Sequence, residues 1–198
     1  MKNIFILVLL GLVMMAQSCI SIPKIQEGGF VSAINVANVQ LKDGQNLKMA
    51  KKRKAEKTTI VLVRHAEKMK DSSDPLLTDE GKERAENLSK ILSTMEVDQI
   101  YSTDYKRTQL TATPTAKSKD LTIQSYNPRK LKDFGNMLLQ KHQGETILVV
   151  GHSNTTPQLL NSLMDKKLVK SIDESDYENL FIINVFEGEE KKALLLKF

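Results

Sequence analysis

The chain has 198 residues, of which 40% are hydrophobic and 27% are charged, as in an ordinary soluble globular protein. This length predicts one domain with an N-terminal extension. The formal net charge of +5 comes from residues 48–57, which hold six basic residues and one acidic residue. The rest of the chain is neutral overall. With no tryptophan and no basic residues interleaved with aromatic ones, a nucleic-acid-binding face is not expected.

Residues 1–18 have the pattern of a bacterial signal peptide. Lys2 supplies the positive charge, and the apolar stretch over residues 4–16 is short for a membrane span. The segment from Ala16 to Cys19 resembles the lipobox of bacterial lipoproteins, in which the cysteine becomes the lipidated first residue. We therefore expect an exported protein that is anchored to a membrane through Cys19, on its periplasmic or outer-membrane face. Two alternatives stay open: an ordinary signal peptide cut near residue 18, and translation from Met49, which would give a cytoplasmic protein.

Residues 19–57 are expected to be a tether between the lipid anchor and the domain. Two glycine-containing turns, Gly28-Gly29 and Asp43-Gly44, flank a weakly apolar stretch, and the basic run follows. The alternative for this stretch is a short extra strand over residues 36–41. The basic run is expected to be solvated linker, with contact to anionic lipid headgroups as the second interpretation.

From residue 58 onward, short apolar runs alternate with amphipathic stretches. The runs predict strands at 58–63, 99–102, 121–124 and 145–150. The amphipathic stretches predict helices at 78–95, 106–117, 128–142 and 156–164, with Thr78 as an N-cap and Pro114 as a kink or end of the second helix. Two final runs, 180–186 and 193–198, predict a terminal β-hairpin or two neighbouring edge strands. The alternation predicts an α/β fold in three layers, with a mostly parallel central sheet and helices on both faces.

Two of the three histidines directly follow predicted strands. Arg64-His65 comes after the strand at 58–63, and Gly151-His152-Ser153 comes after the strand at 145–150. In open α/β sheets, ligands bind outside the carboxyl ends of the strands. Two histidines at that edge, one of them beside an arginine, indicate a site for an anionic, phosphate-like group.

Three motifs in this order resemble the histidine phosphatase superfamily, which has a phosphoglycerate-mutase-like fold. They are Arg64-His65-Ala66-Glu67, the segment from Ser102 to Thr108, and Gly151-His152-Ser153. The resemblance covers residues 58–198 and is closer to small members that lack a large cap. It implies a metal-independent phosphatase without a cofactor, which hydrolyses phosphate esters of small substrates through a phosphohistidine intermediate.

The resemblance also implies roles for individual residues. His65 would be the nucleophile, Arg64 and Arg107 would bind the phosphate, and His152 would be the second histidine of the pocket. A neutral imidazole can attack phosphorus, and the arginine fork suits phosphoryl oxygens. Family members often donate hydrogen bonds to phosphate from the positions of Ser153 and Asn154. Asn154 could equally cap the helix that follows.

The general acid of the family is a carboxylate after the second arginine motif, and no clear equivalent stands out here. Glu67 and Asp133 are the candidates, although Glu67 could serve only to orient Arg64, and Asp133 could lie on the solvent face of its helix. A missing acid would favour substrates with good leaving groups. No functional role is expected for His142. A metal site is not expected, because guanidinium groups beside the histidines would oppose a dication.

Three other functions stay open. A phosphoglycerate-mutase-type phosphotransferase would need a closing cap, and residues 107–145 are too few for a substantial one. A non-catalytic phosphate-binding lipoprotein would be indicated by loss of His65 or an arginine, and neither is lost. A protein phosphohistidine phosphatase fits the small size of the domain. Export argues against it, because the relay domains of histidine kinases lie in the cytoplasm.

Overall fold

The structure is a computed structural model that describes residues 25–35, 37–49, 57–186 and 191–198. Its strands are β1 (Ile25–Ile34), β2 (Asn38–Leu41), β3 (Asn46–Lys48), β4 (Lys57–Arg64), β5 (Gln99–Ser102), β6 (Ile123–Ser125), β7 (Thr146–Gly151), β8 (Asn179–Phe186) and β9 (Lys192–Lys197). Its helices are α1 (Asp79–Ile91), α2 (Lys106–Lys119), α3 (Leu131–Lys141) and α4 (Thr155–Leu163). Within these ranges, no helix is long and apolar enough to cross a membrane.

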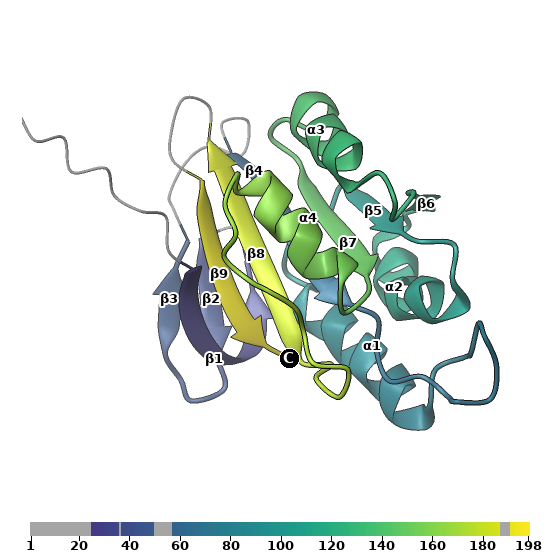
Figure 1. Cartoon of the computed structure of the whole chain (residues 1–198). Helices are drawn as coiled ribbons and strands as arrows, with labels where there is room; N and C mark the ends of the chain where they lie inside the picture. The colour runs from purple at the N-terminus through teal and green to yellow at the C-terminus, as the bar shows by residue number, and fades with distance from the viewer. Residues whose placement is uncertain (1–24, 36, 50–56, 187–190) are drawn as a thin grey trace, which may run out of the picture.

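The described strands form one sheet in the order β3-β2-β1-β9-β8-β4-β7-β5-β6 (Figure 1). β4 and β7 lie in its middle and are buried along their whole length. They pair in parallel, and β5 and β6 continue the parallel part of the sheet. On the other side of β4, β8 pairs antiparallel with both β4 and β9. The sheet is therefore mixed, not mostly parallel as predicted, and its uninterrupted parallel run, β4-β7-β5-β6, carries the two histidines.

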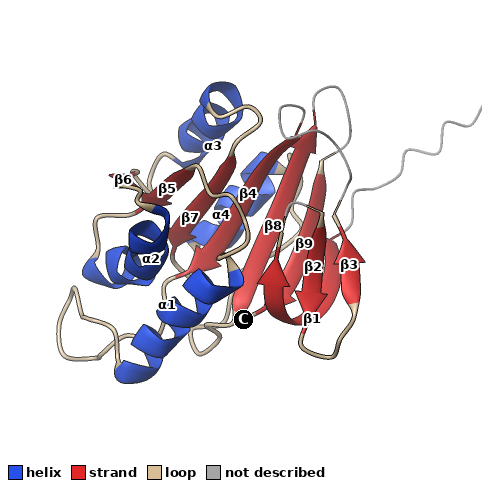
Figure 2. Cartoon of the chain, turned by 180° about the vertical axis from the view of Figure 1, so that it is seen from behind, coloured by secondary structure: helices blue, strands red, loops and turns tan. Residues whose placement is uncertain are grey.

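Helices cover both faces of the sheet, as predicted. α3 and α4 lie on the face seen in Figure 1, and α1 and α2 lie on the face seen in Figure 2. Because successive side chains of a strand point to opposite faces, β4 contributes to both cores. Ile60 and Leu62 pack with α3 and α4, whereas Val61 and Val63 pack with α1 and α2. The predicted α/β fold with a central sheet is confirmed.

The predicted tether is wrong for residues 25–49, which form three strands of the same sheet. β1 pairs in parallel with β9, and β2 and β3 extend the sheet from β1 in antiparallel pairs. Val31, Ile34 and Val39 are fully buried and join the core on the α1 side. The alternative prediction, a short strand at 36–41, corresponds to β2, which spans Asn38–Leu41. β1 is stabilised by pairing with β9, which lies at the far end of the chain, so no local sequence pattern indicates this strand.

Two helices differ from their predicted bounds in ways that shape the site. α2 does not end at Pro114 but continues to Lys119. α3 begins at Leu131, because Asn127 holds the residues before it in a turn. The side-chain oxygen of Asn127 accepts a hydrogen bond from the Arg129 N–H (2.9 Å), and its carbonyl accepts one from the Lys130 N–H (3.1 Å).

Candidate active site

The two histidines lie side by side at the carboxyl ends of β4 and β7. Arg64 lies opposite Gly151 in the parallel ladder, and the His65 N–H donates to the Gly151 carbonyl (2.9 Å). His152 follows directly, and the centroids of the two imidazole rings are 5.6 Å apart at an interplanar angle of 69°. The register of the central strands therefore sets the spacing of the histidine pair.

A glycine is required at position 151 because neighbouring hydroxyl groups leave no room for a side chain. A Cβ at this position would lie 2.8 Å from the Tyr126 hydroxyl oxygen and 2.9 Å from the Thr156 hydroxyl oxygen. Any larger residue would push β7 and the start of α4 apart. The glycine of the Gly-His-Ser motif thus keeps His152 close to the sheet.

His65 is held as a neutral ring with its lone pair on Nε2. Its Nδ1 lies 2.8 Å from the Ala66 carbonyl, which can only accept, so Nδ1 carries the proton. The ring is only 3% exposed, and this burial is the main reason that the pKa of His65 falls to about 3. The charges of Arg64 and Arg107 lower this pKa further. At neutral pH, His65 therefore presents an unprotonated Nε2, the form that a nucleophile needs.

His152 is neutral for similar reasons, but with the opposite tautomer. Its Nδ1 lies 3.5 Å from Nη2 of Arg107, which can only donate, so the proton is on Nε2. Nε2 lies 2.9 Å from the Thr103 hydroxyl, which in turn contacts the Thr108 hydroxyl (2.9 Å). Burial lowers the pKa of His152 to about 4, and the charges of Arg107 and Arg64 add to the effect. A neutral His152 can therefore accept from Arg107 and help to orient its guanidinium.

Arg107 lies in the first turn of α2 and reaches into the cavity beside the histidines. Its Nη1 is 3.6 Å from the Asp74 carboxylate, and its guanidinium carbon is 4.4 Å from the centroid of the Tyr105 ring. Its Nε is buried and has no acceptor among the described residues. An unsatisfied buried donor costs about 1–3 kcal/mol, so an anion that accepts from this N–H would be stabilised.

Arg64 is placed differently from the expected phosphate clamp. It is 1% exposed, and its Nη1 donates to the carbonyls of Asp173, Glu174 and Asp176. Its Nη2 donates to the Glu174 carboxylate (3.0 Å), and its guanidinium lies 4.0 Å from the centroid of the Tyr177 ring. Only its buried Nε lacks an acceptor among the described residues. The terminal nitrogens of Arg64 therefore hold the loop between α4 and β8, and they are not available to a substrate.

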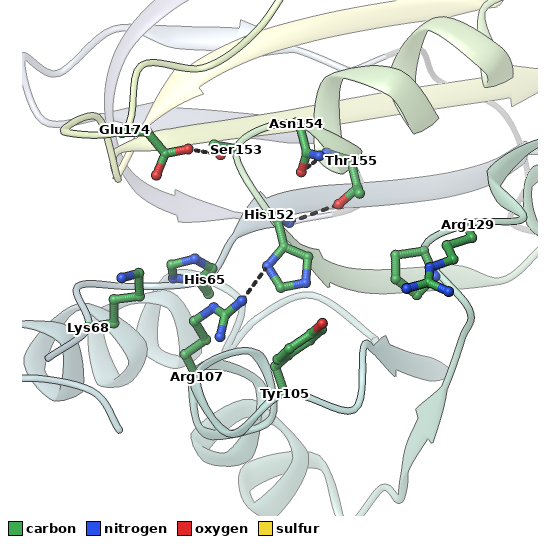
Figure 3. A pocket seen from close by; sticks show the side chains of 11 residues that line it. His65, Lys68, Tyr105, Arg107, Arg129, His152, Ser153, Asn154, Thr155 and Glu174 are labelled. Atoms are coloured by element: carbon green, nitrogen blue, oxygen red, sulfur yellow. Dashed lines mark hydrogen bonds between the residues drawn. The ribbon is translucent and has the colours of Figure 1, made fainter. Parts of the chain in front are cut away.

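A cavity of about 480 Å³ opens beside the histidine pair (Figure 3). Among the predicted site residues, His65, Arg107, His152, Ser153 and Asn154 line it. Asn154 also caps α4, because its side-chain oxygen accepts from the Thr155 N–H (2.9 Å). The structure therefore brings five of the predicted residues together in one cavity, whereas Arg64 does not line it.

Four further residues with charged or aromatic side chains line the cavity, and they were not among the predicted site residues. They are Lys68, Tyr105, Arg129 and Glu174. Lys68 directly follows the first motif and Tyr105 lies within the second, so their positions in the sequence could have indicated that they belong to the site. Arg129 and Glu174 come from turns before α3 and β8, where no sequence pattern marks a site. The Ser153 hydroxyl donates to Glu174, which connects the Gly-His-Ser motif to the distant loop.

Neither predicted candidate for the general acid points into the cavity. Glu67 accepts two hydrogen bonds from Nε of Arg84 (2.8 and 3.0 Å), and it lies 2.7 Å from Nη2 of the same residue. It therefore orients Arg84, not Arg64. Asp133 is exposed on α3 and does not line the cavity. Glu174 is the carboxylate that the cavity does contain among the described residues.

The donor set of this cavity does not suit a metal ion. Among the residues described, no group of three or more histidine, cysteine, aspartate or glutamate side chains could hold one. Both imidazoles lie close enough to Arg64 and Arg107 for the guanidinium charges to lower their pKa values. The same positive field would oppose a dication and would attract an anion.

Residues 60–137 match the family model of the histidine phosphatase superfamily (branch 1). Phosphoserine phosphatase 1 of Hydrogenobacter thermophilus is 39% identical over 71 residues, which are 32% of this chain and 34% of that enzyme. The match thus spans about a third of that relative.

Two solved structures share the fold. A mycobacterial glucosyl-3-phosphoglycerate phosphatase has a TM-score of 0.57 and 11% identity, over 71% of this chain and 99% of its own. A phosphoserine phosphatase of Entamoeba histolytica, solved with phosphoserine, has a TM-score of 0.54 and 14% identity, over 69% of this chain and 94% of its own.

Proposed function

We propose that this chain belongs to the histidine phosphatase superfamily and is a metal-independent phosphatase that hydrolyses phosphate esters through a phosphohistidine on His65. The observation that carries the proposal is the protonation state of His65. The ring is neutral, its Nδ1 donates its proton to the Ala66 carbonyl, and its Nε2 therefore has a lone pair. Beside it, Arg107 offers a buried N–H without an acceptor among the described residues. A nucleophile and an anion donor thus share one cavity.

In the proposed reaction, Nε2 of His65 attacks phosphorus, and the bond from phosphorus to the leaving oxygen breaks with its electrons passing to that oxygen. Arg107 donates to the equatorial oxygens, where negative charge gathers in the transition state. Water then attacks the phosphohistidine, the electrons of the phosphorus–nitrogen bond return to Nε2, and the water proton passes to solvent. His152 keeps Arg107 in place without adding a positive charge of its own.

A phosphatase panel on the purified full chain tests this proposal, with aryl phosphates, sugar phosphates, nucleotides and phosphohistidine as substrates. His65→Ala is expected to abolish turnover, and brief reaction with a radiolabelled substrate should give acid-labile label on the wild type alone. His142→Ala is the matched control, because this histidine contacts Tyr101 (2.9 Å) and Glu145 (2.7 Å) and does not line the cavity. Turnover should survive EDTA. A tenth of wild-type turnover in His65→Ala would exclude His65 as the nucleophile.

We also propose that the protein is exported and anchored through a lipid on Cys19. Residues 1–24 lie outside the described residues, so the lipobox-like segment supports this proposal by its sequence alone. Only residues 20–24 separate Cys19 from β1, and a chain of this length spans at most about 20 Å when extended. The anchor would therefore hold the domain close to the membrane surface, without the long tether that the sequence suggested.

A further inference from the structure

We propose that Arg129 binds a second anionic group of the substrate, one carried by its leaving group. This inference rests on the proposed function and names the substrate class: a phosphorylated compound whose leaving group bears a carboxylate or a second phosphate. Arg129 would then decide which phosphoryl compounds the cavity accepts, while His65 and Arg107 act on the phosphoryl group itself.

The position of Arg129 is set by its main chain, whereas its side chain is free to bind. Asn127 fixes the turn before α3 through its bonds to the N–H groups of Arg129 and Lys130. The side chain of Arg129 is exposed and lines the same cavity as both histidines. Figure 3 shows it on the far side of His152 from His65. The Arg129 side chain and the proposed nucleophile, His65, thus line the same cavity on opposite sides of His152.

Arg129 differs from the other arginines that the structure describes in having no carboxylate partner. Arg64 pairs with Glu174 (3.0 Å), Arg84 with Glu67 (2.7 Å) and Arg107 with Asp74 (3.6 Å). These three pairs neutralise the arginines that have structural contacts. The charge of Arg129 is left uncompensated within the described residues, and it faces a cavity.

The charges around the cavity favour an anion larger than a single phosphoryl group. Lys68 lines the cavity on the His65 side and, within the described part of the chain, forms no ion pair. Both oxygens of Glu174 are already occupied, by Arg64 and by the Ser153 hydroxyl. Positive charge therefore remains at both ends of a cavity of about 480 Å³, a volume in the range of small-molecule sites.

In-line phosphoryl transfer carries the leaving group away from His65, and Arg129 lies on the side of His152 that is away from His65. Attacking and leaving atoms lie roughly in line through phosphorus, so the leaving oxygen points away from Nε2 of His65. The cavity wall there includes Arg129, and Tyr105 and Pro128 also line the cavity. The carboxylate expected after the second arginine motif is absent from this wall among the described residues. An arginine there can bind an anionic leaving group but cannot protonate it, because its guanidinium stays charged.

The test is an equilibrium binding measurement by titration calorimetry on the full chain carrying His65→Ala, which prevents turnover. Each of two ligand pairs compares a compound that has a second anionic group with one that lacks it: 3-phosphoglycerate against glycerol 3-phosphate, and pyrophosphate against inorganic phosphate. In each pair, we expect the ligand with the second anion to bind at least about tenfold more tightly, as for one hydrogen-bonded charge pair. Preference in one pair alone would identify the second group as a carboxylate or as a phosphate.

Adding Arg129→Gln should reduce the preference to about twofold or less, because it weakens binding of the ligand with the second anion far more than binding of glycerol 3-phosphate. Lys130→Gln is the matched control, because it removes the same charge one residue away, from an exposed side chain that does not line the cavity. Equal affinities within both pairs, or a preference that survives Arg129→Gln, would overturn the inference. Binding needs no turnover, so a wild type with an Arg129-dependent preference and no phosphatase activity would contradict the proposed function alone.

Discussion

Asp74 links the loop before α1 to the N-terminus of α2 by contacting Arg107. Its Oδ1 accepts a hydrogen bond from the Lys106 N–H (2.9 Å) and lies 3.6 Å from Nη1 of Arg107. Tyr105, at the N-cap position of α2, makes no side-chain capping bond. A residue from a distant loop therefore caps the helix and positions the arginine that faces the cavity.

Asp74→Ala is expected to lower kcat/KM by about tenfold, because Arg107 would lose the charge that orients it. Asp74→Asn keeps an acceptor for the Lys106 N–H, so it should retain more of the thermal stability while losing most of the effect on Arg107. The comparison is made by steady-state kinetics and thermal unfolding. Asp71→Ala, an exposed change in the same loop, is the control. Equal kinetics in Asp71→Ala and Asp74→Ala would contradict a positioning role.

The two arginines should respond differently to replacement by lysine. Arg64→Lys removes the fork that holds the loop at residues 173–177, so it should lower the free energy of unfolding by about 2 kcal/mol, which corresponds to several degrees in Tm. Arg107→Lys should leave stability nearly unchanged but lower kcat/KM by about 10²-fold. Thermal unfolding with and without vanadate separates the two effects. Vanadate protection of Arg107→Lys as strong as in the wild type would show that Arg107 does not bind the phosphoryl group.

Stability should fall on acidification because of the histidine pair. The pKa of His65 is lowered to about 3 and that of His152 to about 4, from an ordinary value of 6.5, mainly by burial. Between pH 6.5 and 4, the unfolded chain therefore binds more protons than the folded protein. The free energy of unfolding then decreases as the pH falls, by at most about 1.4 kcal/mol per pH unit for each histidine.

Urea unfolding between pH 7.5 and 4.5 measures this slope, and His65→Asn should flatten it. The carboxylates of Asp173 and Asp176 have pKa values below their ordinary value of 3.8, so most of their contribution is lost at a pH below this window. His142→Asn is the control histidine outside the cavity. A wild-type stability that stays constant from pH 6.5 to 4.5 would mean that the histidines are not buried as neutral rings.

Cys19→Ala is expected to release the protein from membranes and to abolish labelling by a radioactive fatty acid. The expectation follows from the segment Ala16 to Cys19, which resembles a lipobox. Cell fractionation and metabolic labelling measure the two outcomes. If the variant still carried the label and still sedimented with membranes, the anchor would have to lie elsewhere.

Much of the domain could be predicted from local sequence. The apolar runs at β4, β5 and β7 were predictable because their residues are buried by the sheet, and burial selects apolar, β-branched side chains. Thr78 was predictable as the N-cap of α1, since capping involves neighbours in sequence. The histidine pair was also predictable, because the ends of parallel strands meet at one edge. The sequence alone thus determined the α/β architecture from β4 onward and the edge of the sheet where the site lies.

Only the tertiary structure decided which other side chains lie beside the histidine pair. Residues 25–49 lack a strong pattern, and their strands form because β1 pairs with β9 and β2 and β3 extend the sheet from β1. Arg64 was expected to bind phosphate, but it holds a loop in place, because three carbonyls and the Glu174 carboxylate accept hydrogen bonds from it. Arg129 enters the cavity because Asn127 delays the start of α3. Each of these outcomes depends on contacts between residues far apart in the chain or on the packing around a turn. The periodicity of a single segment carries no information about them.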